Sequence, residues 1–119
     1  MGAQRRRALG VTGEDRAAKW YIEHGYEVLD RTWRGRDGEL DLVLRLGRTV
    51  VFCEVKTRSG VSFGQPAEAV SLTKQARIRR LAARWLQEHR DRLGPRPAVL
   101  RFDVVAILDG RIDVLEGAF

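Results

Sequence analysis

Residues 38–58 carry the most regular alternation of hydrophobic and polar positions in the chain. Leucines occupy every second position from 40 to 46, which is the period of a β-strand. Gly47-Arg48 follows as a two-residue loop with glycine first, a pattern typical of a type II′ turn, and residues 49–57 form a second run rich in β-branched side chains. The pattern therefore predicts a β-hairpin.

The predicted turn also fixes the pairing of charged residues in this hairpin. With Leu46 opposite Thr49, Asp41 falls opposite Glu54, and Glu39 falls opposite Lys56. Strand alternation places Asp41, Glu54 and Lys56 on one side of the sheet, where two facing carboxylates need a compensating cation. This spacing leaves two interpretations open, a divalent-metal site or a solvated charged face with ordinary cross-strand ion pairs.

The remaining pattern predicts helices before and after the hairpin. A capping-box-like Thr12-Gly-Glu-Asp15 predicts a helix to about His24, and a helical stripe of apolar residues predicts a second helix from about Ser71 to Arg92. Further strands are expected at 26–33, 99–108 and 111–116. The order is αβββαββ, so the sequence predicts an α/β fold with a mixed sheet flanked by helices.

Glu14 lies on the apolar stripe of the first predicted helix. An acidic residue in a first turn ordinarily stabilises the helix dipole. Its position three and four residues before Ala17 and Ala18 also allows a second role, as a third carboxylate reaching over the sheet. Asp103, in the middle of the strand at 99–108, is instead expected to pair with a neighbouring arginine.

The chain is basic, with a formal charge of +6 and a pI near 10.4, and the charge is unevenly distributed. Residues 74–101 contain nine Lys and Arg against two acidic residues, so this segment carries more than the whole net charge. A solvated basic face is the default interpretation, but the local excess favours contact with a polyanion. We therefore expect Lys74, Arg77, Arg80 and Arg84 to bind phosphates of a nucleic acid.

Several simpler features limit the function classes. Cys53 is the single cysteine, so an internal disulfide is excluded, and strand parity predicts that it packs in the core. The longest apolar run, 104–108, is too short to span a bilayer, and no signal peptide is recognisable. We expect a cytoplasmic protein with a mobile basic arm at 1–10 and a single domain at 11–119.

The combined motifs resemble those of the YraN-type family of small bacterial proteins. They comprise Gly13-Glu14, Gly38-Glu-Leu-Asp41, Val51-Phe-Cys-Glu-Val-Lys-Thr-Arg58, Phe63-Gly64, Glu68-Ala-Val70 and Lys74, and together they cover roughly residues 9–114. One departure from the family pattern is Cys53, where a larger aliphatic residue is usual. The family in turn resembles the restriction-endonuclease-like PD-(D/E)xK nucleases and is similar to archaeal Holliday-junction resolvases.

This resemblance implies a metal-dependent endonuclease acting on structured or branched DNA. The signature places catalytic roles on Glu14, Asp41, Glu54 and Lys56, and Mg²⁺ or Mn²⁺ on Asp41, Glu54 and the Val55 backbone carbonyl. Arg58 and the basic helix would hold flanking phosphates. DNA is the expected partner, RNA is the second candidate, and a homodimer would be needed for two symmetric cuts. The alternatives are a nucleic-acid-binding module of nuclease fold with little or no catalysis, and a structural RNA-binding subunit.

Overall fold

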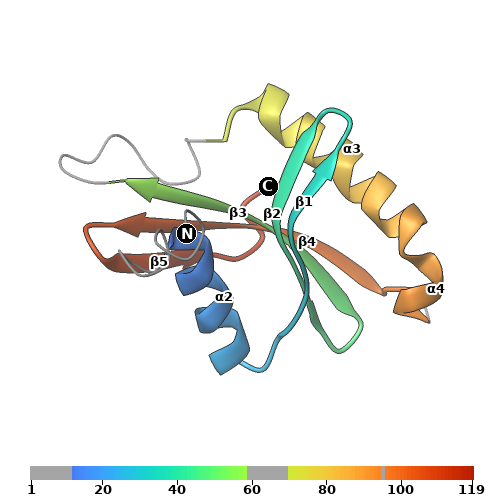
Figure 1. The fold of residues 1–119 in the computed structure, drawn as a ribbon, viewed down its shortest axis with the longest axis horizontal. Coiled ribbons are helices and arrows are strands. Elements are labelled where there is room, and N and C mark those ends of the chain that lie inside the picture. The colour runs from blue at the N-terminus through green and yellow to red at the C-terminus, as the bar shows by residue number, and fades with distance from the viewer. Residues whose placement is uncertain (1–11, 59–69, 95) are drawn as a thin grey trace, which may run out of the picture.

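The computed structural model describes residues 12–58, 70–94 and 96–119, and within these ranges the chain forms one sheet with helices on both faces (Figure 1). The predicted arm at 1–10 lies outside the described residues, as does the side chain of Arg58. Within the described ranges, no helix combines the length and apolar character needed to cross a membrane.

Helix α2 (Gly13–Glu23) begins with the predicted capping box. The backbone N–H of Asp15 donates to the Thr12 hydroxyl at 3.0 Å, and the Asp15 carboxylate accepts from the Thr12 N–H at 3.3 Å. These two bonds satisfy backbone donors that the first turn of a helix otherwise leaves unpaired. The capping box thus sets where α2 begins, and with it the position of Glu14.

The sheet has five strands in the order β1-β2-β3-β4-β5. Neighbouring strands are antiparallel except β3 and β4, which are parallel, so the predicted mixed sheet is confirmed. The parallel step requires a crossover, which contains helices α3 (Leu72–Glu88) and α4 (Arg90–Leu93). The strands are β1 (Glu27–Gly35), β2 (Gly38–Leu46), β3 (Thr49–Arg58), β4 (Val99–Leu108) and β5 (Arg111–Leu115).

Each face of the sheet has its own hydrophobic core. Helix α2 packs on one face over Leu42, Leu44 and Cys53, and helix α3 packs on the other over Val43 and Phe52 (Figure 1). The predicted core role of Cys53 is confirmed, since its side chain is buried, and Trp85 of α3 is buried as well. Alternate residues of the central strands thus point to opposite helices, which fixes the face that each polar residue of β3 occupies.

The predicted hairpin register is correct near the turn and wrong beyond it. Gly47 has a φ of +60°, as the first position of a type II′ turn requires, and pairing runs from Leu46–Thr49 to Leu42–Cys53. The ladder then ends, so Asp41 is not paired with Glu54, nor Glu39 with Lys56. Glu39 instead pairs with Arg34 of β1, with 3.5 Å between Nε and Oε2.

Candidate functional site: a carboxylate and lysine cluster where β2 leaves β3

The pairing of β2 and β3 ends just where the acidic residues of the hairpin begin. Beyond Cys53, the N–H of Val55 has no backbone acceptor on β2, and it donates instead to Oδ2 of Asp41 at 2.8 Å. The Asp41 side chain therefore replaces one bond of the ladder. It is held against the backbone of the residue that directly follows Glu54.

The environment of Asp41 raises its pKa to about 6, well above the ordinary value for an aspartate. Burial is the largest cause because it disfavours the charged form, and the Val55 N–H partly opposes it by stabilising the carboxylate. The negative charges of Glu54, Glu14 and Glu39 raise the pKa further. A cation at this position would offset both the cost of burying the charged carboxylate and its repulsion by the neighbouring acidic residues.

Glu54 lies on the α3 face of β3, where two lysines contact one of its oxygens. The Nζ of Lys74 is 2.7 Å from Oε1, and the Nζ of Lys56 is 3.5 Å from the same atom. Lys56 is two residues after Glu54 on β3, whereas Lys74 lies in the first turn of α3. The Glu54 side chain is only 11% exposed, so this contact is shielded from solvent.

The two lysines are not equivalent. Burial and the nearby charge of Lys74 lower the pKa of Lys56 below the ordinary lysine value. Burial also acts to lower the pKa of Lys74, but its hydrogen bond to Glu54 and the charges of Glu54 and Asp41 outweigh burial and raise it. Lys74 is thus the firmly charged partner of Glu54, and Lys56 is the lysine that loses its proton more easily.

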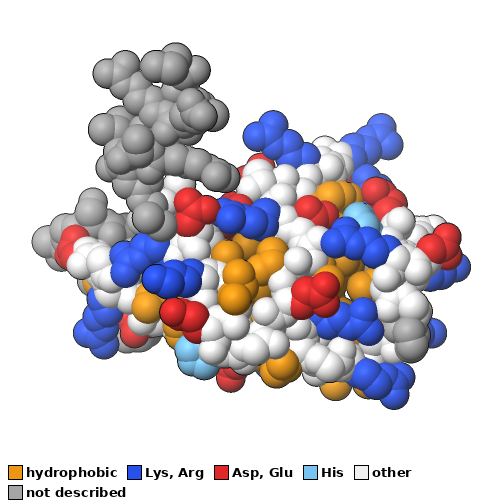
Figure 2. Space-filling model, turned by 60° about the horizontal axis from the view of Figure 1, so that its bottom comes forward, with side chains coloured by type: hydrophobic (Ala, Val, Ile, Leu, Met, Phe, Trp, Pro, Cys, Tyr) orange, Lys and Arg blue, Asp and Glu red, His pale blue; other side chains and the backbone are white. Residues whose placement is uncertain are grey.

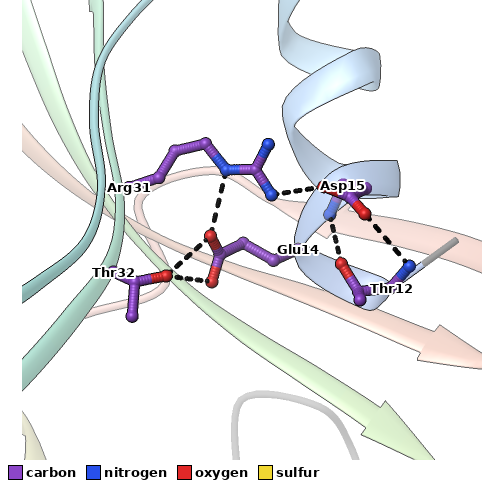
Figure 3. A pocket seen from close by; sticks show the side chains of 5 residues that line it. All are labelled: Thr12, Glu14, Asp15, Arg31 and Thr32. Carbon is purple, nitrogen blue, oxygen red and sulfur yellow. Dashed lines mark hydrogen bonds and ion pairs between the residues drawn. The ribbon is translucent and has the colours of Figure 1, made fainter. Parts of the chain in front are cut away.

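Glu14 is engaged elsewhere, in an open pocket between α2 and β1 (Figure 3). Its carboxylate accepts from Nε of Arg31 at 3.0 Å and from the Thr32 hydroxyl at 2.9 Å. Arg31 also forms an ion pair with Asp15. Glu14 therefore influences Asp41 by its charge, while its oxygens are occupied by β1.

The donors around Asp41 fit a hard divalent cation. One oxygen of Asp41 and one oxygen of Glu54 are used in the contacts above, and among the described residues the second carboxylate oxygen of each has no such contact. In a strand the N–H and C=O of one residue point to the same side, so the Val55 carbonyl is directed toward the side that Asp41 occupies. Oxygen donors of this kind suit Mg²⁺. Across residues 12–58, 70–94 and 96–119, however, no three His, Cys, Asp or Glu side chains converge closely enough to hold a metal by themselves.

Comparison with known proteins gives the family. The model of the family described as "Uncharacterised protein family UPF0102" matches residues 13–107. The chain belongs to the UPF0102 family. It is 52% identical to a UPF0102 protein of Frankia alni over the full length of both chains. It is 54% identical to one of Beutenbergia cavernae, over 87% of this chain and 85% of that one, and 52% identical to one of Rhodococcus jostii, over 87% and 84%.

This result confirms the resemblance to the YraN-type family, which is a member of the restriction-endonuclease-like superfamily. Among the residues that carried the resemblance, those at 13–14, 38–41, 51–58 and 74 fall on the elements just described, while those at 63–64 and 68–69 lie outside the described residues. Asp41 and Glu54 lie on adjacent strands, and Lys74 lies on the helix that packs over them. Family membership supports the nuclease-like fold of this UPF0102 protein, while its activity is a separate question.

The predicted phosphate-binding side chains divide into two groups. Arg77, Arg80 and Arg84 are exposed on α3, as a phosphate contact requires, and we refer to them as the α3 arginine row. Lys74 is instead committed to Glu54. On the face drawn in Figure 2, basic side chains are interspersed with acidic ones and do not form one block.

Two features of the site were not predicted from the sequence, the role of Lys74 and the partners of Glu14. Lys74 was predicted to bind phosphate only. Because it lies in the first turn of the helix that follows β3, it could also have been considered as an ion-pair partner for Glu54 on that strand. Arg31 and Thr32 were not considered, because nothing in the pattern of β1 indicated that both side chains turn toward Glu14. Thr32 adopts a φ of +47°, which is rare for a β-branched residue and was not predictable.

Proposed function

We propose that the protein is a metal-dependent nuclease that hydrolyses phosphodiester bonds in structured or branched DNA. One observation carries the proposal. The Asp41 carboxylate is held on the Val55 N–H, next to Glu54 and its two lysines, where β2 leaves β3. Burial that raises the pKa of Asp41 to about 6 lowers stability at neutral pH, and a bound cation would offset this cost.

In this proposal Asp41, Glu54 and the Val55 carbonyl hold Mg²⁺ or Mn²⁺. The cation would supply an activated water and would offset negative charge on the scissile phosphate. Lys56, which lies beside Glu54, would position the attacking water or stabilise negative charge in the transition state. Lys74 keeps Glu54 oriented and adds positive charge beside the phosphate.

Glu14 and the α3 arginine row act at a greater distance in the same proposal. Glu14 is fixed by Arg31 and Thr32, so it would orient a water at the edge of the site. The α3 arginine row would bind phosphates on either side of the cut without reading bases. Binding and cleavage therefore rest on different residues, and they can be tested separately.

The test is incubation of the purified protein with branched, flapped and linear DNA, with Mg²⁺, with Mn²⁺ and with EDTA. We expect metal-dependent cleavage of a branched or flapped substrate by the wild type. Asp41→Asn should abolish the cleavage and change the dissociation constant for DNA by less than about threefold, because the α3 arginine row is intact. Cleavage that survives Asp41→Asn would reject the proposed site.

A second function is favoured by the contacts of Glu14 and Glu54. Arg31 and Thr32 occupy Glu14, and two lysines occupy Glu54, so the acidic residues are neutralised without a metal. This arrangement suits a nucleic-acid-binding module that retains a nuclease fold with little catalysis of its own. Metal-independent binding, together with no cleavage of any of the three DNAs by the wild type, would select this function over the nuclease.

A further inference from the structure

A groove with an apolar floor lies at the end of α3 away from Glu54. It has a volume of about 780 Å³, within the range of pockets that bind small molecules and cofactors. One stripe of α3 and α4 forms its first wall, and the chain leading into β4 forms the second. The lining residues are Ala83, Leu86, Gln87, Arg90, Leu93, Gly94, Arg96, Pro97 and Leu100.

Both walls are tied to the hairpin formed by β2 and β3. Arg45 donates from Nη1 to the Leu93 carbonyl at 3.0 Å, and Arg48 donates from Nη2 to the Arg96 carbonyl at 3.2 Å. The N–H of Ala98 donates to the Arg48 carbonyl at 2.9 Å. These bonds hold the groove in shape without a ligand, so a ligand would meet a largely preformed surface.

The lining combines apolar side chains with positive charge. Leu86, Leu93, Pro97 and Leu100 provide the apolar surface, and Leu100 is 45% exposed. Among the described residues, no acidic side chain lines the groove and none forms an ion pair with Arg90 or Arg96. A flat, weakly polar group attached to an anion fits this chemistry.

The α3 arginine row lies along the helix between Lys74 and the groove. Along α3 the arginine row follows Lys74, and Gln87 of the groove comes three residues after Arg84, so these side chains lie on adjacent turns. At 1.5 Å per residue, the groove begins about 14 Å from Lys74 along the helix and extends to about 20 Å. At 3.4 Å per base pair, that separation corresponds to about four to six base pairs of DNA.

We propose that this groove binds an unpaired nucleotide of a DNA strand whose duplex portion lies along α3. The base would rest on the apolar floor, and Arg90 and Arg96 would bind its phosphates or stack on its face. The proposal rests on the proposed function for its substrate and adds a substrate class to it. A junction between duplex and single strand would lie about four to six base pairs from the carboxylate cluster.

The charge of the lining selects nucleic acid over a protein segment. An apolar peptide would leave Arg90 and Arg96 without a counter-charge, and burying them unpaired is costly. The phosphates of a DNA strand supply negative charge at regular spacing, and the α3 arginine row would bind the phosphates next to the groove. An acidic peptide is the rival occupant, and it predicts no preference between DNAs that differ only in an unpaired tail.

The test measures binding in EDTA, so that it does not depend on catalysis. Fluorescence anisotropy would give dissociation constants for a blunt duplex and for the same duplex with a single-stranded tail. The key variant is Leu100→Glu, which places a negative charge in the groove at an exposed position. The matched control is Val99→Glu, because Val99 is 50% exposed on the adjacent position of β4 and lies outside the groove lining.

We expect the wild type and Val99→Glu to bind the tailed duplex about tenfold more tightly than the blunt duplex. Leu100→Glu and Arg96→Ala should reduce that ratio to below about twofold while leaving blunt-duplex affinity similar to that of Val99→Glu. A photoreactive thymine analogue in the tail should cross-link to the peptide that contains residues 86–100. Equal binding of both DNAs by the wild type, or equal loss in both glutamate variants, would overturn the proposal.

This outcome is distinguishable from failure of the proposed nuclease activity. A protein that prefers the tailed duplex in EDTA and cuts nothing in Mg²⁺ supports the groove and rejects the enzyme. A protein that cuts in Mg²⁺ and shows no tail preference supports the enzyme and rejects the groove.

Discussion

At Asp41, burial and a hydrogen bond act on the same carboxylate in opposite directions. Burial dominates and raises the pKa to about 6, compared with an ordinary value of 3.8. Between these two values the folded protein holds a proton that the unfolded chain has released, so stability falls as the pH rises through this window. The charged form at neutral pH is therefore a source of instability in the metal-free protein.

Asp41→Asn should stabilise the metal-free protein at pH 7.5 by about 1–2 kcal/mol. The amide oxygen can still accept from the Val55 N–H, and the variant has no buried negative charge at this position. At pH 5 the difference should shrink, because the wild-type carboxyl is then largely protonated. Urea unfolding of both proteins at the two pH values measures the effect. A difference that is independent of pH would show that the charge of Asp41 is not the cause.

The two lysines on Glu54 should differ in their effect on the proposed cleavage. Lys56→Met removes the lysine with the lowered pKa and should reduce the cleavage rate at saturating DNA by about 10²–10³-fold. Lys74→Met removes the closer and more firmly charged partner of Glu54. The cleavage rate of this variant should fall by only about tenfold, and it should bind DNA more weakly. Single-turnover kinetics separates the two effects. Equal losses of rate with unchanged binding would contradict the division of roles.

At the level of elements, the sequence predicted every strand and helix around the site but not the bend in β2. The leucines at 40–46 suggest one continuous face, whereas Leu40 belongs to the α3 core and Leu42 to the α2 core. Leu40 pairs with Trp33 and Leu42 with Arg31, so Asp41 and Thr32 lie between these two pairs, and Thr32 has a left-handed backbone. A strict period of two cannot express this change of face.

The predicted pairing of Asp41 opposite Glu54 is therefore wrong in its geometry. Asp41 contacts β3 through the Val55 N–H at a split between the strands, and Glu54, the residue before Val55, is not opposed to it in a ladder. The regular pattern was sufficient for the register near Gly47 because turn geometry fixes it there. Further along, the outcome depends on packing against two helices, which local pattern does not encode.

Helix α3 carries the predicted binding surface, and its exposed arginines can be tested as a unit. Arg80→Ala combined with Arg84→Ala should lower the slope of log binding constant against log salt by about 2, since each lost phosphate contact releases about one fewer counterion. The matched control combines Arg34→Ala with Arg111→Ala, which removes two exposed arginines from surface ion pairs. Anisotropy titrations over a range of salt concentrations give both slopes. Similar slopes for the two double variants would indicate that binding follows net charge and not this helix.

At the scale of the whole molecule, one buried carboxylate joins three distant segments. Asp103 of β4 is fully buried, accepts two hydrogen bonds from Arg101 at 2.9 Å, and accepts from the Tyr21 hydroxyl of α2 at 2.6 Å. The N–H of Gly117 donates to it at 2.9 Å, which fixes the segment after β5. The predicted pairing with a neighbouring arginine is confirmed, and the network is fully satisfied, which marks Asp103 as structural.

Asp103→Asn should destabilise the protein by about 3 kcal/mol or more, because the amide cannot accept all four bonds and leaves Arg101 without its buried counter-charge. The matched control is Asp113→Asn, whose exposed pair with Arg111 is worth about 0–1 kcal/mol. Tyr21→Phe removes a single bond to the same carboxylate and should cost about 1–2 kcal/mol, which keeps the test readable if Asp103→Asn does not fold. Urea unfolding gives the three values. Because α2 also carries Glu14, loss of the Tyr21 contact should weaken the attachment of the helix that positions Glu14. Equal stability of Tyr21→Phe and the wild type would show that hydrophobic contacts alone hold α2 on the sheet.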